Sequence, residues 1–308
     1  MAPGIPIVGT LVGGIVDFLE DGKTGLAARV DNPADVADKI ERIINDAGLR
    51  NRIREEGRRV ALTKYQWGMI ANDFRSVFQS VMTEGKRLHI LVATPLFPPD
   101  IGGPATYSKI LADGLPNLGI SIDVLPFRSV RHLPYAIRHL MYFFFLVKRA
   151  LHADIIYAQD PVSVGVPATL ASFALRKKFL VKIVGDRAWE KSIEKSWSDD
   201  LLDEFLGKSY GFRVGWMRFL QKLTARRASR IIVPSRYLKS AVTRWGVQEE
   251  KIIVIPNAAE ARETGLSKDE ARSLLAVDGT ILVSAGRLVP WKGFSMLIEL
   301  MPDLIRVR

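Results

Sequence analysis

Short apolar runs alternate with stretches of helical spacing along most of the chain. The run over residues 88–93 is typical of a buried strand, and the strand-like runs that follow span residues 120–125, 154–158, 179–184, 230–234 and 252–255. Helical stretches separate these runs, the first of them beginning at about Ala105. Strands that alternate with helices in this way predict a parallel, doubly wound α/β sheet.

The first 81 residues follow another order, with strand, turn, strand and then helices. Residues 5–8 form a β-branched run, and residues 21–25 have turn chemistry. Asn32 and Pro33 are typical of a helix start, as the cap and the first helical position. Two further helices are predicted over about residues 47–62 and 67–82.

The end of the chain adds a predicted strand over residues 280–285 and a helix that begins near Phe294. This helix has no cap at Arg308, and the opening strand follows Met1 almost directly. Both ends of the chain therefore look cut. The stretch 82–86, by contrast, resembles a natural protein start.

Composition and length indicate a globular protein with room for two domains. Of the 308 residues, 48% are hydrophobic and 25% are charged. The chain has no cysteine, which excludes disulfides and thiolate metal sites and favours an intracellular, cytoplasmic protein. The opening lacks a basic region, so it is a poor signal peptide, and the apolar run 140–147 is too short to span a bilayer.

The formal net charge of +11 is unevenly distributed. No acidic residue occurs between Arg128 and His152, or between Gly207 and Gln248. Such blocks favour anionic partners, namely phosphates, acidic lipid headgroups or nucleic acid, although a solubilising basic face is an equal alternative. No recognition motif for nucleic acid accompanies the blocks, so nucleic acid is not an expected partner.

Two loops contain residues suited to binding phosphate. Gly102 and Gly103 precede a predicted helix, where backbone N–H groups can approach an anion without obstruction by side chains. Arg287 and Lys292 follow the predicted strand 280–285, at the sheet edge where open α/β folds bind ligands. The planar guanidinium of Arg287 and the compact ammonium charge of Lys292 suit a diphosphate. An ordinary turn and solvated cations are the alternatives.

A family resemblance appears when these motifs are taken in order. PPDIGGPATYS is followed by YAQDP, VKIVGDRAWE, IIVPSRYLK, IIVIPNAAE and SAGRLVPWKG. This series resembles the retaining glycosyltransferases of family 4 over residues 86–308. The resemblance implies a GT-B architecture, in which an acceptor-binding and a donor-binding Rossmann-like domain face each other across a cleft.

The opening segment resembles the end of the same family's donor domain. MAPGIPIVGTLVGGIVDFLEDGKTG is similar to the family pattern EAMAxGxPVVxT followed by GGxxExxxxGxTG. The resemblance therefore implies rotated motif order, with residues 1–81 as a C-terminal donor-domain part, 86–240 as the acceptor domain and 241–308 as the first donor-domain part. The middle of the donor domain, including the E-x7-E glutamates, is expected to be missing, as in a fragment, a fusion or a permuted chain.

The resemblance also implies roles for individual residues. Arg287 and Lys292 are expected to hold the donor phosphates and to stabilise the leaving diphosphate, with Gly102 and Gly103 shaping the opposite wall. No metal or other cofactor is expected, and the four histidines show no metal-ligand spacing. The donor is a nucleotide-diphosphate sugar, and the acceptor is a glycan or a lipid-linked molecule.

The acceptor or sugar is expected to contact side chains that follow two of the predicted strands. These are Gln159, Asp160, Asp186 and Glu190. Gln159 stands where many family members have histidine, and it cannot titrate. A strand-end turn is an equal alternative for the pair 159–160.

The basic and aromatic stretch 128–150 is the candidate membrane contact. Its expected contact residues are Arg131, Arg138, Phe143, Lys148 and Arg149. Such residues on a short helix can lie in a lipid interface, which would place the protein peripherally on the inner face of the membrane. A buried helix with a basic rim is the alternative.

The leading function is hexose transfer with retention, and the alternative is a catalytically inactive remnant that binds an acceptor or a partner subunit.

Overall fold

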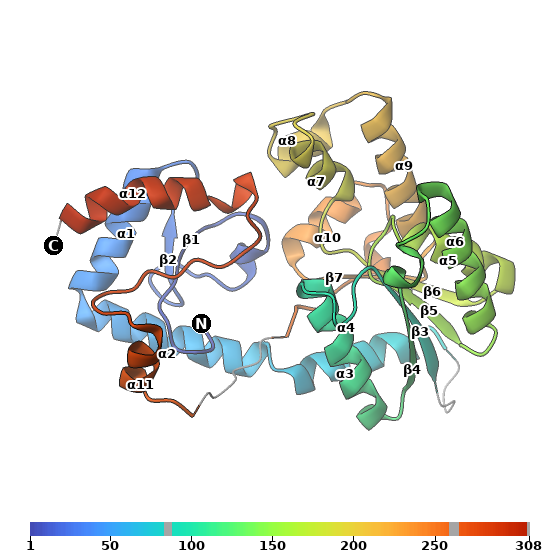
Figure 1. Ribbon diagram of the computed structural model, residues 1–308, viewed down its shortest axis with the longest axis horizontal. Coiled ribbons are helices and arrows are strands. Elements are labelled where there is room, and N and C mark those ends of the chain that lie inside the picture. The colour runs from blue at the N-terminus through green and yellow to red at the C-terminus, as the bar shows by residue number, and fades with distance from the viewer. Residues whose placement is uncertain (83–87, 259–264, 307–308) are drawn as a thin grey trace. The chain divides into compact units, whose positions relative to one another are not determined.

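The structure is a computed structural model, and it describes residues 1–82, 88–258 and 265–306 of the chain. The chain divides into two units, which are described separately (Figure 1). The central unit comprises residues 67–258, and the terminal unit comprises residues 1–66 with the described part of 259–308.

The central unit contains a parallel sheet, which has six strands among the described residues, in the order β4-β3-β5-β6-β7-β8. Its strands are β3 (His89–Thr94), β4 (Ser121–Pro126), β5 (Ile155–Ala158), β6 (Lys178–Lys182), β7 (Arg230–Val233) and β8 (Ile252–Val254). Each strand falls within a residue or two of a predicted run, and the α/β fold class is confirmed. The runs of the inner strands β3, β5, β6 and β7 are detectable because these strands are almost entirely buried, whereas the edge strands β4 and β8 are only partly buried.

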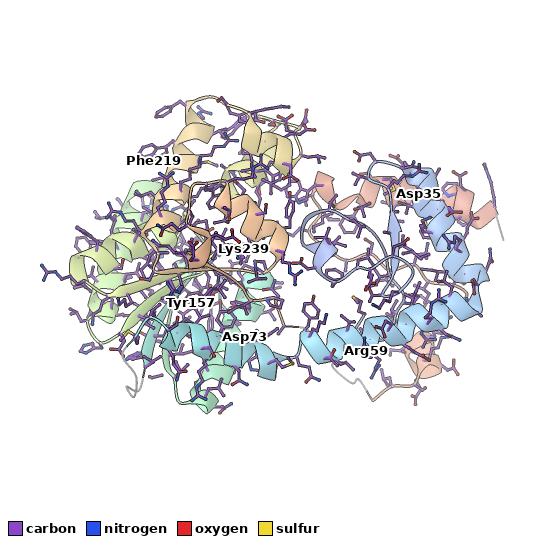
Figure 2. All side chains as sticks on the ribbon, turned by 180° about the vertical axis from the view of Figure 1, so that it is seen from behind. Asp35, Arg59, Asp73, Tyr157, Phe219 and Lys239 are labelled. Atoms are coloured by element: carbon purple, nitrogen blue, oxygen red, sulfur yellow. The ribbon has the colours of Figure 1, made fainter. Side chains whose placement is uncertain are left out.

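Helices cover both faces of this sheet. They are α3 (Trp67–Gln79), α4 (Gly103–Gly114), α5 (Tyr135–Ala150), α6 (Gly165–Leu175), α9 (Phe212–Arg227) and α10 (Arg236–Thr243). Two further helices, α7 (Arg187–Glu194) and α8 (Leu202–Gly207), pack with α9 in a smaller apolar cluster. Successive β5 residues point to opposite sides, so Ile156 joins a core with α5, α6 and α9, whereas Tyr157 packs against Phe74 and Phe78 of α3. Figure 2 shows Tyr157 at the sheet.

The terminal unit combines both ends of the chain. Its elements are β1 (Val8–Thr10), β2 (Leu26–Ala28), α1 (Pro33–Asn45), α2 (Ala47–Lys64), α11 (Lys268–Leu275) and α12 (Phe294–Arg306). β1 and β2 pair in parallel. The predicted cap is confirmed, because Asn32 Oδ1 accepts a hydrogen bond from Asp35 N at 2.9 Å. Val36 and Ile40 of α1 share a core with Leu300 of α12.

Two strand predictions fail in the terminal unit: the predicted run 5–8 overlaps β1 only at Val8, and the strand predicted over residues 280–285 is not formed. Residues 280–285 have no strand assignment, and no described strand pairs with them. Val283 is 75% exposed, and Ile281 is exposed as well. The apolar pattern favours a strand there, but a strand also requires a hydrogen-bonding neighbour, which the described residues do not supply.

The unit boundaries also differ from the predicted domain boundaries. The helix α3 packs its apolar face into the central unit, and β8 pairs with β7, so the breaks fall after residues 66 and 258 instead of 81 and 240. Long-range packing, which local patterns do not encode, decides both boundaries. The expected start at residues 83–86 and the end of IIVIPNAAE, residues 259–260, lie outside the described residues.

Candidate functional site

The strand order of the central unit locates a candidate site. If β3 is counted as the first strand of this sheet, the strands lie across the sheet in the order 2-1-3-4-5-6. The direction of the crossover connections therefore reverses between β3 and β5. Open α/β sheets bind ligands at the carboxyl ends of the strands on either side of such a reversal. The loop 95–102 follows β3 and Gln159 follows β5, so this topology brings two of the predicted segments to one sheet edge.

The loop after β3 ends in the predicted glycine pair. Gly102 has φ 144°, a conformation that a side chain would strain, and Gly103 begins α4. Asp100 of this loop forms an ion pair with Arg131, 3.2 Å from Oδ1 to NH1. Arg131, predicted as a membrane contact, therefore holds the loop from the end of the neighbouring strand β4.

Gln159 connects the two sides of the site. Its side chain is 4% exposed, and its Oε1 accepts a hydrogen bond of 2.5 Å from the Ser108 hydroxyl of α4. Ser108 Oγ also lies 2.8 Å from Thr94 Oγ1, at the end of β3. The amide Nε2 of Gln159 is buried without a hydrogen-bond partner among the described residues. It is a donor for which a ligand or an ordered water is the natural partner.

Asp160 and its surroundings form the other part of this edge. Asp160 Oδ1 accepts hydrogen bonds from the backbone N–H groups of Val162, at 2.8 Å, and Ser163. Its half-exposed side chain keeps a second oxygen for other partners. The nearby His139 of α5 packs on Phe127, with ring centroids 5.1 Å apart. Burial, and then the charge of Arg138, lower the pKa of His139, which favours the neutral imidazole.

Asp186 and Glu190 lie at the start of α7, after β6. Asp186 is 1% exposed, and its Oδ1 caps α7 by accepting from Trp189 N at 2.9 Å. Its Oδ2 is buried without a hydrogen-bond partner in the described part of the chain. Glu190 is half-exposed and pairs with Arg187 at 3.5 Å. Asp186 thus supports the loop, whereas Glu190 is accessible to a ligand.

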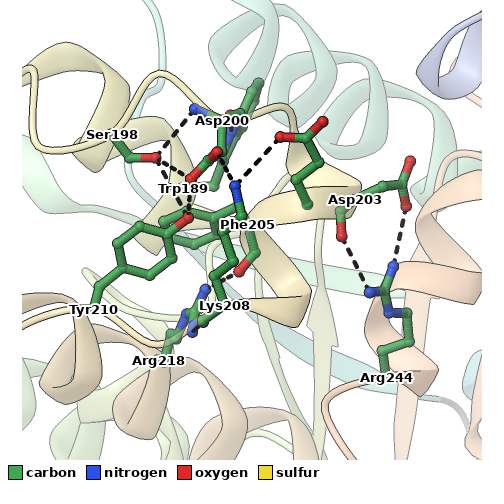
Figure 3. Close-up of polar contacts among 10 residues, drawn as sticks. Trp189, Ser198, Asp200, Asp203, Phe205, Lys208, Tyr210, Arg218 and Arg244 are labelled. Carbon is green, nitrogen blue, oxygen red and sulfur yellow. Dashed lines mark hydrogen bonds and ion pairs between the residues drawn. The ribbon is translucent and has the colours of Figure 1, made fainter.

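A polar network joins α7 to the segment 198–218 (Figure 3). Trp189 Nε1 donates to Asp200 O at 2.9 Å, and the Asp200 carboxylate binds Lys208, Tyr210 and Ser198. Hydrogen bonds from Lys208 and then Tyr210 hold the pKa of Asp200 well below its ordinary value. Arg218 of α9 continues the network. The network fixes a segment whose sequence predicts no clear pattern.

The predicted phosphate-binding cations lie in the terminal unit. Arg287 and Lys292 are both exposed and belong to the loop that precedes α12. Lys292 N donates to Val289 O at 3.0 Å. A Cβ at Gly286 would lie 3.8 Å from Lys292 Cδ, so the lysine side chain passes over this glycine. The two cations thus lie in a loop before a helix, as predicted. The strand expected before this loop is not formed by residues 280–285.

The remaining predicted membrane contacts have mixed environments. Arg149 pairs with Asp123 at 2.9 Å, and Phe143 is partly buried against the core. Arg138 is half-buried, with its guanidinium carbon 5.9 Å from the Phe127 ring centroid. Lys148 is exposed. The side chains predicted along α5 therefore do not form one exposed surface.

Lys182 is a buried residue for which the sequence motifs predict no role. It is the last residue of β6 and is 2% exposed. Its Nζ lies 2.8 Å from Asn257 Oδ1 and 3.1 Å from the Tyr107 ring centroid. A lysine inside the apolar run VKIV was the available signal, because lysine is almost never fully buried without a partner.

Comparison with known proteins identifies the central unit. The family model described as "Glycosyl transferase 4-like domain" matches residues 91–258, more than half of the chain. The chain belongs to this family. A second model, "Glycosyl transferases group 1", matches residues 1–60 of this glycosyl transferase 4-like chain.

Curated relatives match over shorter stretches. An uncharacterized glycosyltransferase of Methanocaldococcus jannaschii is 33% identical over 81 residues, which is 26% of this chain and 23% of the relative. The N-acetyl-alpha-D-glucosaminyl L-malate synthase of Bacillus anthracis is 28% identical over 86 residues, which is 28% of this chain and 23% of the relative. The matched stretches thus span less than a quarter of these relatives' lengths.

A solved structure of Anabaena HepE in complex with UDP-glucose is also similar. Its TM-score is 0.47 at 19% identity, and the match covers 70% of this chain and 57% of HepE.

Among the described residues no group of three acidic, histidine or cysteine side chains is placed to hold a metal ion. In the same residues no helix combines the length and apolar character that crossing a membrane requires.

Proposed function

We propose that this chain is part of a retaining glycosyltransferase. It transfers a hexose from a nucleotide-diphosphate sugar to a glycan or lipid-linked acceptor, without a metal. The family match over residues 91–258 carries the proposal, and the switch-point edge supports it, because the Gln159 amide there has no hydrogen-bond partner among the described residues.

The acceptor is proposed to bind at the carboxyl edge of the central sheet. Asp160 and Glu190 are half-exposed and can reach a hydroxyl, whereas Asp186 is buried and supports the loop behind it. Gln159 is also buried, with its amide Nε2 left to donate to a bound group. Backbone N–H groups at Gly102 and Gly103 are suited to an anion at the start of α4.

The leaving diphosphate is proposed to be neutralised by Arg287 and Lys292. Both cations are exposed in a loop before a helix, a position from which they can reach phosphate oxygens. Removing one well-placed charge donor of this kind typically costs a factor of about a hundred or more in rate.

Calorimetric titration of the full chain with UDP, GDP and ADP tests the donor site. We expect one nucleotide diphosphate to bind, Lys292→Ala to abolish that binding, and the control Lys268→Ala, at the exposed start of α11, to leave it unchanged. Transfer to an acceptor, with the anomeric configuration of the product determined by NMR, tests retention.

A second function is favoured by one observation. Residues 280–285 do not form the strand that would support the Arg287 loop, so the donor loop lacks that anchor in the described structure. The alternative is therefore a non-catalytic protein that binds an acceptor or a partner subunit. Binding of an acceptor glycan with no affinity for any nucleotide diphosphate would favour this alternative and refute the transferase proposal for the chain.

A further inference from the structure

Three helices of the central unit pack side by side on one face of the sheet. The helix α6 contacts both α5 and α9 (Figure 1). Lys177 Nζ, just after α6, donates to Leu151 O at the end of α5 at 3.3 Å. The Arg227 guanidinium carbon at the end of α9 lies 5.9 Å from the Phe173 ring centroid of α6. The outer surfaces of the three helices are therefore continuous.

Large apolar side chains project from this surface, which is defined here as the outer helix face. Its main residues are Leu140 and Phe144 of α5, Phe173 of α6, and Phe212, Trp216 and Phe219 of α9. Phe173 is 74% exposed and Phe212 is 85% exposed. Trp216 stacks with Phe212 and with Phe219, at centroid distances of 6.4 and 5.4 Å, and Figure 2 shows Phe219 on the outer side of α9.

The charge on these helices has one sign. None of α5, α6 and α9 contains Asp or Glu, and cations gather at their C-terminal ends, namely Lys148, Arg149, Arg176, Lys177, Arg226 and Arg227. Favourable interaction with the helix dipole accounts for cations at C-terminal ends, but it equally favours acidic residues in the first turn. No acidic residue occupies the first turn of any of the three helices. The three helices therefore contribute no negatively charged side chain of their own to the outer helix face.

We propose that the outer helix face docks on an anionic lipid bilayer surface. Exposed aromatic rings suit the interfacial region of a bilayer, and adjacent cations suit its phosphates. A second copy of the chain fits less well, because two acid-free basic faces repel each other. The proposal extends the contact predicted over residues 128–150 to α6 and α9; within that stretch Arg131 pairs with Asp100 and Arg149 pairs with Asp123.

Vesicle sedimentation with the full chain tests the proposal. Vesicles of phosphatidylcholine with phosphatidylglycerol are compared with phosphatidylcholine alone, at low and at physiological salt. We expect binding to the anionic vesicles, weakened by salt. The double variant Trp216→Ser, Phe219→Ser should bind at least about tenfold more weakly, because two aromatic side chains no longer leave water.

Two variants act as controls. Met69 of α3 is as exposed as Trp216 (53% against 51%) but lies on a helix that packs against the other face of the sheet, so Met69→Ser should bind vesicles like the wild type. Trp216→Phe keeps an aromatic ring and should retain binding. Unchanged unfolding midpoints would verify that these surface variants fold.

Several results would overturn the proposal. One is failure of the wild type to bind anionic vesicles at low salt, and a second is a loss of binding in Met69→Ser as large as that in the double variant. A third is a wild-type dimer that becomes monomeric in the double variant without any vesicle binding, which would assign the face to a second copy.

Discussion

At the scale of a single residue, Lys182 combines burial with a charge-bearing group. Burial lowers the pKa of Lys182 well below its ordinary value. Among the described residues, the Lys182 ammonium meets the side-chain oxygen of Asn257 and the ring face of Tyr107. The native state therefore favours the neutral amine more than the unfolded chain does.

We predict that Lys182→Met removes a pH-dependent loss of stability. Because the folded pKa is lowered, the unfolded chain binds more protons between that pKa and the ordinary value of about 10.4, so wild-type stability rises with pH in this window. The methionine variant should lack this slope and be as stable as the wild type at pH 7, or about 1–4 kcal/mol more stable. Asn257 is exposed and can bond to water instead.

Urea unfolding at pH 7 and pH 9.5 measures both effects. Lys178→Met is the matched control, since Lys178 lies on the same strand but is exposed. Its pH slope should equal that of the wild type. A Lys182→Met variant with the wild-type slope, or with a large loss of stability at pH 7, would show that the lysine is a stabilising cation.

At the scale of elements, the sequence predicts what is buried better than what is paired. The strands of the central sheet are found within one or two residues because continuous apolar runs indicate strands covered on both faces. The same signal over residues 280–285 fails, because no described strand is available as a partner.

The candidate site shows the same limit. Gly102 and Gly103 are recognisable from local chemistry and lie where expected at the start of α4. The partners Asp100–Arg131 and Ser108–Gln159 are 31 and 51 residues apart in the chain, and only the folded sheet brings them together. An interaction that depends on such a partner has no local signature, so the sequence predicts a membrane contact for Arg131 but not its ion pair with Asp100.

Replacing glycine with alanine should change the stability in opposite directions at two positions in the neighbouring helices α6 and α9. A Cβ at Gly165, the first residue of α6, would lie 2.4 Å from Asp160 O and 3.0 Å from Thr224 Cγ2, so the backbone beside the candidate site must move. Gly165→Ala should destabilise the protein by about 1–3 kcal/mol. A Cβ at Gly215 within α9 meets nothing within 4 Å, and Gly215→Ala should stabilise by about 0.5–1 kcal/mol.

Urea unfolding followed by circular dichroism compares these two variants with the wild type. Both variants gain the same methyl group, so the difference between their free energies of unfolding reports how much space surrounds each glycine. Equal shifts of the unfolding midpoint in one direction would contradict the close contact between Gly165 and Asp160.

At the scale of the whole molecule, the two units should differ in stability. The central sheet has six strands and two large cores, whereas the terminal unit contains one pair of three-residue strands among its described residues. Short two-stranded sheets are marginally stable. Hydrogen exchange should therefore be faster in β1 and β2 than in β3, β5 and β6, and low urea should increase it first in the terminal unit. Uniform protection across both units would contradict this expectation.

The exposed segment 280–284 should also govern self-association of the molecule. Its sequence, TILVS, has high β-propensity and carries no charge or proline, and no described strand covers it. Such a segment can pair with the same segment of another chain. The net charge of +11 opposes this encounter, so association should increase as salt screens the repulsion.

Val283→Lys should suppress this salt-dependent association, as measured by light scattering and sedimentation velocity. Leu274→Lys is the control, because Leu274 is 76% exposed against 75% for Val283, gains the same charge, and lies on the helix α11. If only Val283→Lys abolishes association, strand pairing drives it. Equal suppression by both variants would assign association to exposed apolar surface and net charge, and the unpaired segment would have no special role.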